Sequence, residues 1–223
     1  MTRKPPLVKI CGLSTAASLS AALDAGADMV GFVFFGPSPR NISLSEAASL
    51  GRLVRGRAKK VALTVDADDA LIDAISRALD PDVLQLHGRE TPARAKTLSA
   101  RTGKEIMKAI GVSERADLAA VPAYAEVCDW LLLDAKPPKD ATRPGGNGQA
   151  FDWSILNGFS PGKPWLLSGG LTPANVADAL ALTGAPGVDV SSGVESAPGV
   201  KDEAAIRAFV TAARALSSSD TKG

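Results

Sequence analysis

Short apolar segments alternate with longer amphipathic segments along almost the whole chain, and this alternation constrains the fold more than any other feature. Eight of the short segments are rich in Val, Ile and Leu, as strands buried on both faces are. These predicted strands are residues 8–11, 29–34, 60–65, 83–86, 105–110, 130–133, 165–167 and 188–190. Strands that alternate with helices indicate an α/β fold with a parallel sheet. The predicted helices include one that Ser43 or Ser45 caps and that runs to Val54, one over residues 114–121 that ends at Pro122, and one over residues 174–182 with Pro173 in its first turn.

Polar residues stand at the end of most of these strands. They are Cys11 after the first, Arg40 after the second, His87 after the fourth, Asp134 after the sixth, Ser168 to Gly170 after the seventh and Ser191 to Gly193 after the eighth. A (β/α)₈ barrel gathers the carboxyl ends of its strands on one face, so it would bring all of these residues into one pocket. The length of 223 residues fits one such barrel.

The alternative is an open, doubly wound sheet, which normally carries a glycine fingerprint directly after its first strand. No such fingerprint is present, and Gly146-Asn147-Gly148 belongs to no G-x-G-x-x-G turn, so a dinucleotide site is not expected. We therefore predict a single (β/α)₈ barrel domain over residues 1–216. Residues 217–223 are polar and are expected to form a frayed tail.

The composition excludes several classes of function. Lys plus Arg number 25 and Asp plus Glu number 24, so no overall charge draws the chain to nucleic acid or an anionic membrane. No apolar stretch is long enough to span a membrane. Two cysteines in unlike positions indicate a reduced, cytoplasmic protein. One histidine and no ligand-spaced cysteines suggest neither a metal nor a cofactor.

Two loops of small residues follow the last two predicted strands. They contain Gly169 and Gly170 in one, and Ser191, Ser192 and Gly193 in the other. Small residues let backbone N–H groups approach an anion closely, and these loops are the usual phosphate site of barrels. Either loop alone could equally be a tight turn, but together they predict a phosphate-binding site.

Cys11 permits two interpretations. A cysteine at the end of an apolar strand is most often a small buried hydrophobic residue. At the mouth of a barrel it could instead be a thiolate base or nucleophile, if its surroundings favour ionisation. Cys128, which precedes the sixth strand, is interpreted as structural.

Asp134 and Arg40 are the other candidates for chemistry. Burial of a carboxylate favours its protonated form, so Asp134 could act as a general acid, although an Asx turn is an equal alternative. Arg40 lies in a rigid, Pro-rich loop, and its planar guanidinium suits a carboxylate ligand; the alternative is a solvated surface arginine.

Three further residues are expected to support the pocket rather than to react. His87, the only histidine, is more often a hydrogen-bonded neighbour of a catalytic group than the catalyst. Asp189 could equally orient a loop or bind a sugar hydroxyl. Lys9 precedes Cys11 by two positions, and we assign it to the support of the pocket.

Several motifs together resemble one family. They are Lys9-Ile10-Cys11-Gly12, Phe32-Val33-Phe34-Phe35 with Ser38-Pro39-Arg40, Gln85-Leu86-His87-Gly88, Leu133-Asp134, Gly145-Gly146-Asn147-Gly148 with Phe151-Asp152-Trp153, Ser168-Gly169-Gly170-Leu171 and Asp189-Val190-Ser191-Ser192-Gly193-Val194-Glu195. From residue 7 to residue 216 the chain resembles the phosphoribosylanthranilate isomerases, barrel enzymes of tryptophan biosynthesis. The first and last motifs are the specific ones.

The resemblance implies an Amadori rearrangement of N-(5′-phosphoribosyl)anthranilate, with a small-molecule substrate and no cofactor. It also implies that Cys11 is the general base, Asp134 the general acid and Arg40 the ligand of the anthranilate carboxylate. One departure lies at the end of the third strand, where Asp66 stands in place of an expected asparagine. A monomer and a homodimer are both open.

Two rival functions remain. One is a neighbouring indole-pathway barrel, such as an indole-glycerol-phosphate synthase, which would use a lysine acid and glutamates; only Lys108 and Glu105 are candidates. The other is a non-catalytic barrel that binds a phosphorylated metabolite. Such a protein would keep Gly170 and Ser192 but would have no need for Cys11 and Asp134.

Overall fold

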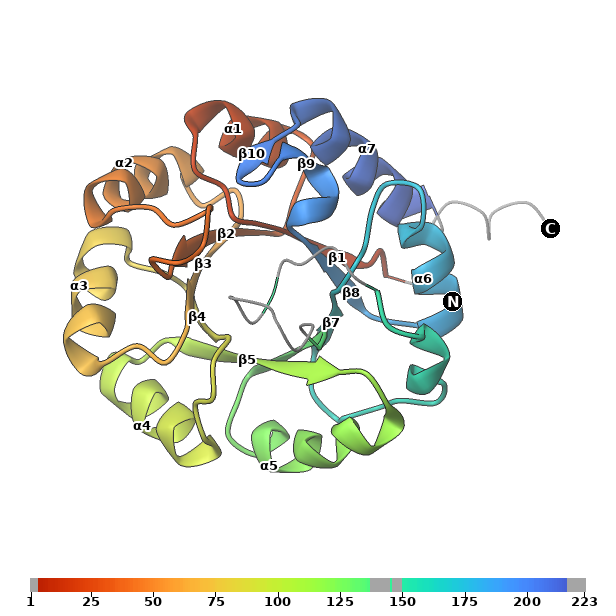
Figure 1. The fold of residues 1–223 in the computed structure, drawn as a ribbon. Coiled ribbons are helices and arrows are strands. Elements are labelled where there is room, and N and C mark those ends of the chain that lie inside the picture. Colours follow the sequence, from red (N-terminus) through yellow and green to blue (C-terminus); the bar gives the residue numbers. More distant parts are fainter. Residues whose placement is uncertain (1–3, 137–144, 146–149, 216–223) are drawn as a thin grey trace.

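The computed structural model describes residues 4–136, 145 and 150–215. Eight parallel strands form a closed barrel in chain order, and the last strand pairs with the first (Figure 1). The strands are β1 (Leu7–Cys11), β2 (Met29–Phe34), β3 (Lys59–Thr64), β4 (Val83–Leu86), β5 (Glu105–Val112), β6 (Trp130–Ala135), β7 (Trp165–Leu167) and β8 (Gly187–Val190). The prediction of a (β/α)₈ barrel is confirmed.

Helices form a ring around the barrel (Figure 1). They are α1 (Ala16–Asp24), α2 (Leu44–Val54), α3 (Asp69–Leu79), α4 (Pro92–Thr102), α5 (Val121–Ala125), α6 (Val176–Thr183) and α7 (Glu203–Arg214), with the 3₁₀ segments η1 (Arg115–Ala120), η2 (Trp153–Leu156) and η3 (Ser192–Val194). A small antiparallel hairpin, β9 (Glu195–Ala197) and β10 (Val200–Lys201), follows β8.

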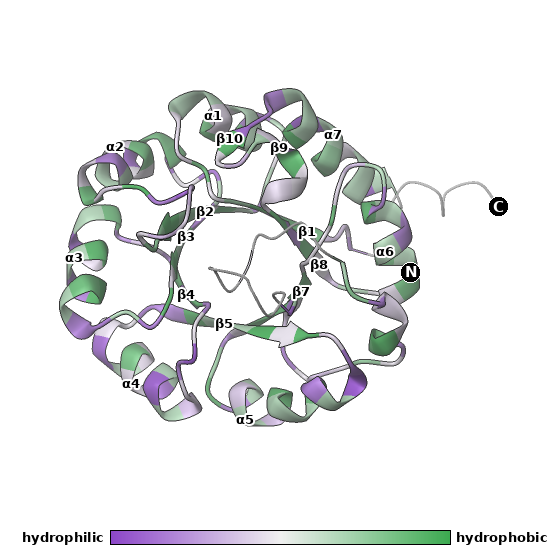
Figure 2. Cartoon of the chain, viewed as in Figure 1, coloured by the Kyte–Doolittle hydropathy of each residue, from purple (hydrophilic) through white to green (hydrophobic). Residues whose placement is uncertain are grey.

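The strands consist mainly of apolar residues, and the barrel wall is largely green in Figure 2. The larger buried cluster packs between the strands and the helices, and a smaller one fills the inside of the barrel with Met29, Val61, Val83, Met107, Ala109, Leu132 and Leu166. Inward-facing positions recur every second residue. The next inward residues after Val83, Leu132 and Leu166 are therefore polar: Gln85, Asp134 and Ser168.

Capping side chains and a glycine mark the ends of several helices. Ser43 caps α2 with a capping box, in which its hydroxyl accepts from the Glu46 N–H and the Glu46 carboxylate accepts from the Ser43 N–H. Thr91 caps α4, with a proline in the first turn. Gly26 follows the end of α1 with φ of 85°, a backbone conformation that glycine adopts without strain.

Two expected helices are placed differently. We predicted a helix from 114 to 121 that ends at Pro122, but η1 runs into α5, whose first turn contains the proline; a proline there lacks only an N–H that has no partner within the helix. Pro173 was expected to open a helix at 174, but α6 begins at Val176 behind the cap residue Asn175. The β9–β10 hairpin was not predicted.

No helix in the described ranges is long and apolar enough to cross a membrane. Two features noted from the sequence, the Gly146-Asn147-Gly148 segment and the tail 217–223, lie outside the described residues.

We expect Cys128 to weaken the fold at alkaline pH. Its thiol is buried, and burial raises its pKa from 9.0 to about 11. Between these two values the unfolded chain releases the thiol proton and the folded chain keeps it, so stability falls as pH rises, by up to roughly 3 kcal/mol. Urea unfolding of wild type and Cys128→Ala from pH 8 to 11 measures this. A pH slope that is equal in the two proteins would contradict the expectation.

Candidate active site

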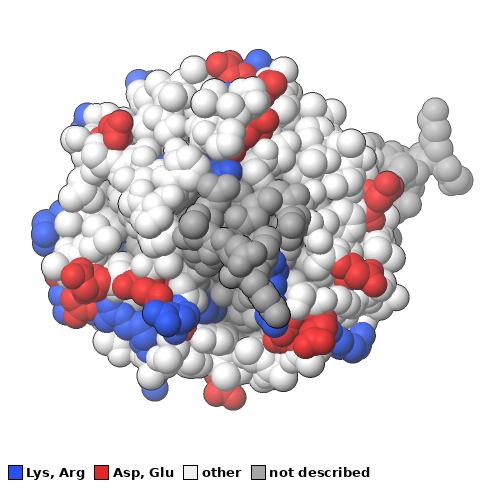
Figure 3. All heavy atoms as spheres, viewed as in Figure 1, with Lys and Arg blue, Asp and Glu red and all other residues white. Residues whose placement is uncertain are grey.

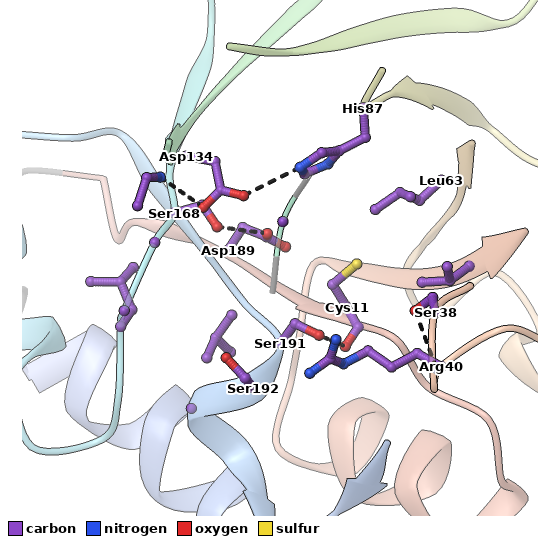
Figure 4. Close-up of a pocket in the computed structure, with 18 of the residues that line it drawn as sticks. Cys11, Ser38, Arg40, Leu63, His87, Asp134, Ser168, Asp189, Ser191 and Ser192 are labelled. Carbon is purple, nitrogen blue, oxygen red and sulfur yellow. Dashed lines mark hydrogen bonds and ion pairs between the residues drawn. The ribbon is translucent and has the colours of Figure 1, made fainter. Parts of the chain in front are cut away.

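A pocket opens at the carboxyl ends of the barrel strands (Figure 4). It is lined by apolar side chains and by several convergent polar groups, as small-molecule sites are. The predicted site residues that line it are Cys11, Arg40, His87, Asp134, Gly169, Gly170, Asp189, Ser191, Ser192 and Gly193. Lys9 does not line the pocket and is completely buried.

Cys11 ends β1 and directs its sulfur into the pocket (Figure 4). Its neighbour across the strand pair is Gly31, where a Cβ would lie 2.9 Å from Cys11 Sγ, so glycine makes room for the thiol. Burial raises the pKa of the Cys11 thiol, and the positive charges of Lys9 and Lys201 oppose this only in part. The thiol therefore keeps its proton at neutral pH although these two cations favour its ionisation.

Lys9 supplies the nearest such cation. Its ammonium lies 2.7 Å from Asp189 Oδ1, and the second oxygen of Asp189 accepts a hydrogen bond of 3.1 Å from the Ser168 hydroxyl. Burial alone would lower the pKa of Lys9, but Asp189 and Cys11 outweigh it and raise the pKa overall. Each carboxylate oxygen of Asp189 thus has one partner inside the barrel, and the residue also lines the pocket.

Asp134 and His87 face Cys11 across the pocket (Figure 4). They come from β6 and from the end of β4, on the side of the barrel away from β1. His87 Nε2 lies 3.2 Å from Asp134 Oδ2, and Asp134 Oδ1 accepts a 2.9 Å hydrogen bond from the Ala135 N–H. The imidazole and the Ala135 N–H thus contact the two oxygens of the carboxylate while it lines the pocket.

Gly145 lies directly against this pair. A Cβ at position 145 would approach His87 Nε2 to 2.5 Å and Asp134 Oδ2 to 2.8 Å. Any larger side chain would have to displace the imidazole or the carboxylate. Glycine at this position therefore allows the backbone to cover the hydrogen bond between the two side chains.

Arg40 is fixed by a partner that we did not predict. Its Nε and Nη2 donate to the two oxygens of Glu195 at 2.7 and 2.8 Å, and Lys201 donates to the same carboxylate at 2.8 Å. Burial alone would raise the pKa of Glu195, but the two cations lower it. All three side chains are at most 5% exposed, so one carboxylate lies between two cations and an excess positive charge remains beside the pocket.

The two glycine loops have the backbone conformations that phosphate loops use. Gly169 and Gly170 have φ of 89° and 65°, and a Cβ at Gly193 would lie 1.8 Å from the Leu171 oxygen. In the part of the chain that the structure describes, the N–H groups of Gly170, Ser192 and Gly193 find no acceptor. Free N–H groups that border a pocket are suited to an anion.

The candidates of the rival synthase lie elsewhere. Lys108 is outside the pocket, buried in an ion pair of 2.9 Å with Glu90. Glu105 stands at the start of β5, where it pairs with Lys59 at 2.6 Å. Asp66 also lies outside the pocket: it has φ of 49° and accepts a hydrogen bond from the Arg89 N–H. The residues in the pocket therefore do not support the synthase.

The described residues contain neither a metal-ligand cluster nor a charged face at the pocket rim. Among the described residues, no group of three or more His, Cys, Asp or Glu side chains is arranged to hold a metal ion. Figure 3 shows acidic and basic side chains interspersed around the rim of this face of the molecule. The positive charge next to the pocket is therefore local and comes from buried side chains.

Three residues with clear roles in the geometry were missed from the sequence: Gln85, Glu195 and Lys201. Gln85 and Glu195 belong to motifs that we quoted, but a polar side chain inside a strand or after a loop gives no sign of its partner. Lys201 lies in the unpredicted hairpin. The one available signal was the inward register of Gln85, two positions before His87.

The fold and the pocket define a class: a (β/α)₈-barrel enzyme that holds a thiol opposite a carboxylate–imidazole pair, beside a positively charged edge. A family model described as N-(5′-phosphoribosyl)anthranilate (PRA) isomerase matches residues 8–212. The chain belongs to this family.

Individual members of this family are similar to the chain over almost its whole length. The N-(5′-phosphoribosyl)anthranilate isomerase of Nitrobacter hamburgensis is 62% identical over 209 residues, which cover 94% of this chain and 93% of the relative. That of Bradyrhizobium diazoefficiens is 61% identical, with 94% of each chain covered. The crystal structure of phosphoribosyl anthranilate isomerase from Thermotoga maritima superposes with a TM-score of 0.84 at 34% identity and covers 93% of this chain and 98% of that one.

A further solved structure is a phosphoribosyl anthranilate isomerase in complex with reduced 1-(o-carboxyphenylamino)-1-deoxyribulose 5-phosphate. Its TM-score is 0.81 at 32% identity, and the match covers 93% of this chain and 98% of that chain. The molecule bound there carries a phosphate at one end and a carboxylate at the other.

Proposed function

We propose that this chain isomerises N-(5′-phosphoribosyl)anthranilate to 1-(2-carboxyphenylamino)-1-deoxyribulose 5-phosphate in tryptophan biosynthesis. Membership of the family supports this reaction. The observation that carries it is the position of Cys11 and Asp134, which face each other across one pocket between two regions suited to anions. A proton donor and a proton acceptor at the same reacting centre are what the rearrangement requires.

Asp134 acts first, as the general acid. It gives a proton to the furanose ring oxygen, the bond between that oxygen and C1′ breaks, and the anilino nitrogen forms a protonated Schiff base with C1′. The Ala135 N–H and the His87 imidazole both contact the carboxylate, so they stabilise the negative charge that remains after proton transfer.

Cys11 acts second, as the general base. Its thiolate removes the proton from C2′, which gives an enolamine, and the enolamine tautomerises to the C2′ ketone with a methylene group at C1′. C2′ is oxidised and C1′ is reduced within one molecule, so no external oxidant or reductant takes part. Lys9 stabilises the thiolate because its buried ammonium lies close to the sulfur.

The two ends of the substrate are held separately. The phosphate accepts hydrogen bonds from the N–H groups of the Gly169–Gly170 and Ser191–Gly193 loops. The anthranilate carboxylate binds the edge of Arg40 formed by Nη1 and the second Nη2 proton, since Glu195 occupies the other edge. The excess positive charge of Arg40 and Lys201 favours a dianionic ligand.

The reaction is tested by mixing the purified protein with freshly prepared phosphoribosylanthranilate and following the loss of its fluorescence. Chromatography separates the deoxyribulose product from anthranilate, which spontaneous hydrolysis releases. We expect the product to form with the protein and not without it. Formation of anthranilate alone, at the rate seen in buffer, would contradict the proposal and favour a barrel that only binds a metabolite.

Arg40→Lys should raise KM at least about ten-fold and change kcat little, because a point charge replaces a planar group that donates to Glu195 and to the substrate together. An inhibitor that lacks the anthranilate carboxylate should bind wild type and variant alike. The matched control is Arg89→Lys, since the Arg89 side chain is 94% exposed. A second inhibitor that keeps this carboxylate should bind the variant less tightly than wild type. If Arg40→Lys weakens the binding of the two inhibitors equally, the carboxylate is bound elsewhere.

We also propose that the protein works in the cytoplasm as a monomer or a homodimer. Both cysteines of the chain are free and buried, which supports a reducing compartment. A solved relative from Thermotoga maritima is described as a dimeric enzyme from which monomers were generated. Analytical ultracentrifugation of the purified chain distinguishes the two states.

A further inference from the structure

Gln85 is the buried polar residue of the barrel interior that the proposed reaction leaves without a role. It lies on β4, two residues before His87 on the same face of the strand, and it is fully buried. Its amide nitrogen lies 3.0 Å from His87 Nδ1. Among the described residues its amide oxygen has no hydrogen-bond partner. Gln85, His87 and Asp134 thus form a chain of hydrogen bonds from the barrel interior to the pocket.

The direction of these hydrogen bonds follows from the chemistry of the groups. An amide nitrogen donates and does not accept, so His87 Nδ1 must be the acceptor and must lack a proton. The single proton of the neutral imidazole then lies on Nε2, which points at Asp134 Oδ2 from 3.2 Å.

The other orientation of the Gln85 amide is less favourable. If oxygen and nitrogen were exchanged, both protons of the NH₂ group would be buried without an acceptor in the described part of the chain. In the orientation of the structure, one N–H of the amide has an acceptor and the amide oxygen has no donor. An unpaired buried oxygen costs less than an unpaired buried NH₂ group, because buried N–H groups without partners are rarer than buried carbonyl oxygens without them.

We propose that Gln85 is a positioning residue that holds His87 in its Nε2-protonated tautomer, so that His87 donates to Asp134. The tautomer does not depend on the identity of the substrate. Its effect on turnover rests on the proposed function: after Asp134 gives up its proton, the Nε2–H bond stabilises the carboxylate that is left.

Other ionisable groups face this chain of hydrogen bonds from the elements around it. Cys11, Arg40, Lys136 and Asp189 line the same pocket as His87. Lys9 on β1 lies behind them, and Lys108 on β5 donates to the backbone oxygens of Leu86 and Gly88 on either side of His87 and pairs with Glu90. Lys136 is paired with Asp117, and Lys9 with Asp189. None of these ion pairs includes Gln85 or His87. A substitution at Gln85 therefore changes the hydrogen bonding of the His87 imidazole directly and leaves the ion pairs in place.

The chain has one histidine, so the tautomer can be read directly. In tag-free protein labelled with ¹⁵N, a long-range ¹H–¹⁵N correlation spectrum contains one pair of imidazole nitrogens. For wild type at neutral pH we expect Nε2 to be of the protonated type and Nδ1 of the unprotonated type. A wild-type spectrum with a protonated Nδ1 would overturn the proposal, whether or not any variant folds.

Gln85→Met removes the donor and nearly keeps the volume, so we expect a mixture of tautomers and a kcat about ten-fold lower, with KM within about two-fold. The matched control is Thr64→Val: the Thr64 hydroxyl is also buried without a partner in the described chain, but it does not line the pocket. The control should keep both the tautomer and kcat.

If Gln85→Met keeps the wild-type tautomer and kcat, Gln85 does not position His87. If wild type proves unable to isomerise phosphoribosylanthranilate, the proposed function fails, but the spectra still decide the tautomer. The two failures are therefore distinguishable.

Discussion

Cys11→Ala is expected to fold like wild type and to lose at least about 10²-fold in kcat, the lower range for loss of a general base. Cys11→Ser should be nearly as inactive, because a hydroxyl group ionises far less readily than a thiol. Steady-state kinetics on both variants measure the effect, and Cys128→Ala is the control with little change. Turnover near that of wild type in either Cys11 variant would show that this thiol is only a small buried side chain.

The ionisation of Cys11 gives an independent check. Burial raises the pKa of its thiol above the ordinary 9.0, so the thiolate should form only above that pH in the free protein. Because the base acts in its ionised form, a raised pKa means that less of it is active at neutral pH than in an exposed thiol. The difference in ultraviolet thiolate absorbance between Cys128→Ala and the Cys11→Ser/Cys128→Ala double variant measures the titration. A midpoint below 9.0 would contradict the burial argument.

Asp134→Asn is the second substitution for which we expect a large loss of kcat. The amide keeps the shape of the side chain and removes the proton that opens the furanose ring, so kcat should fall at least about 10²-fold while substrate binding is largely kept. His87 Nε2 can still donate to the amide oxygen, so the pocket should stay intact.

A substrate analogue whose ring is already open separates the acid step from the rest. A pre-formed imine needs no proton on the ring oxygen, so Asp134→Asn should process it at a rate close to that of wild type. Cys11→Ala should remain impaired with the same analogue, because the C2′ proton must still be removed. If Asp134→Asn is equally slow with the open form, Asp134 has a task other than protonation of the ring oxygen.

The barrel could be predicted from the sequence because each strand carries its own signal. Runs such as Met29–Phe34 are apolar at every position, which only a strand covered on both faces explains. The start of α2 could be predicted to within two residues, because Ser43 and Ser45 were both candidate caps and Ser43 is the cap. The placements of Pro122 and Pro173 were wrong because a proline fits the first turn of a helix and also the turn before it.

The pocket residues at the strand ends were predictable, since parallel strands in a barrel present these ends on one face. Their partners were not. The bidentate pair of Arg40 and Glu195 joins residues 155 positions apart, and no local pattern encodes such a contact. The partner of Gln85 likewise cannot be predicted until the register of β4 places its side chain next to that of His87. The sequence therefore indicates which groups can react but not what holds them in place.

The closure of the barrel between β1 and β8 has a consequence for synthesis of the protein. Lys9 and Asp189 are 180 residues apart, and so are Cys11 and Ser191, whose hydroxyl donates to the Cys11 carbonyl oxygen. Until β8 has left the ribosome, Lys9 has no Asp189 to pair with, and the edge of β1 that pairs with β8 is open. Contacts between such distant segments form slowly. Enzyme activity should therefore appear only with completed chains, and nascent chains that stop after α6 should be inactive and prone to associate through the open edge.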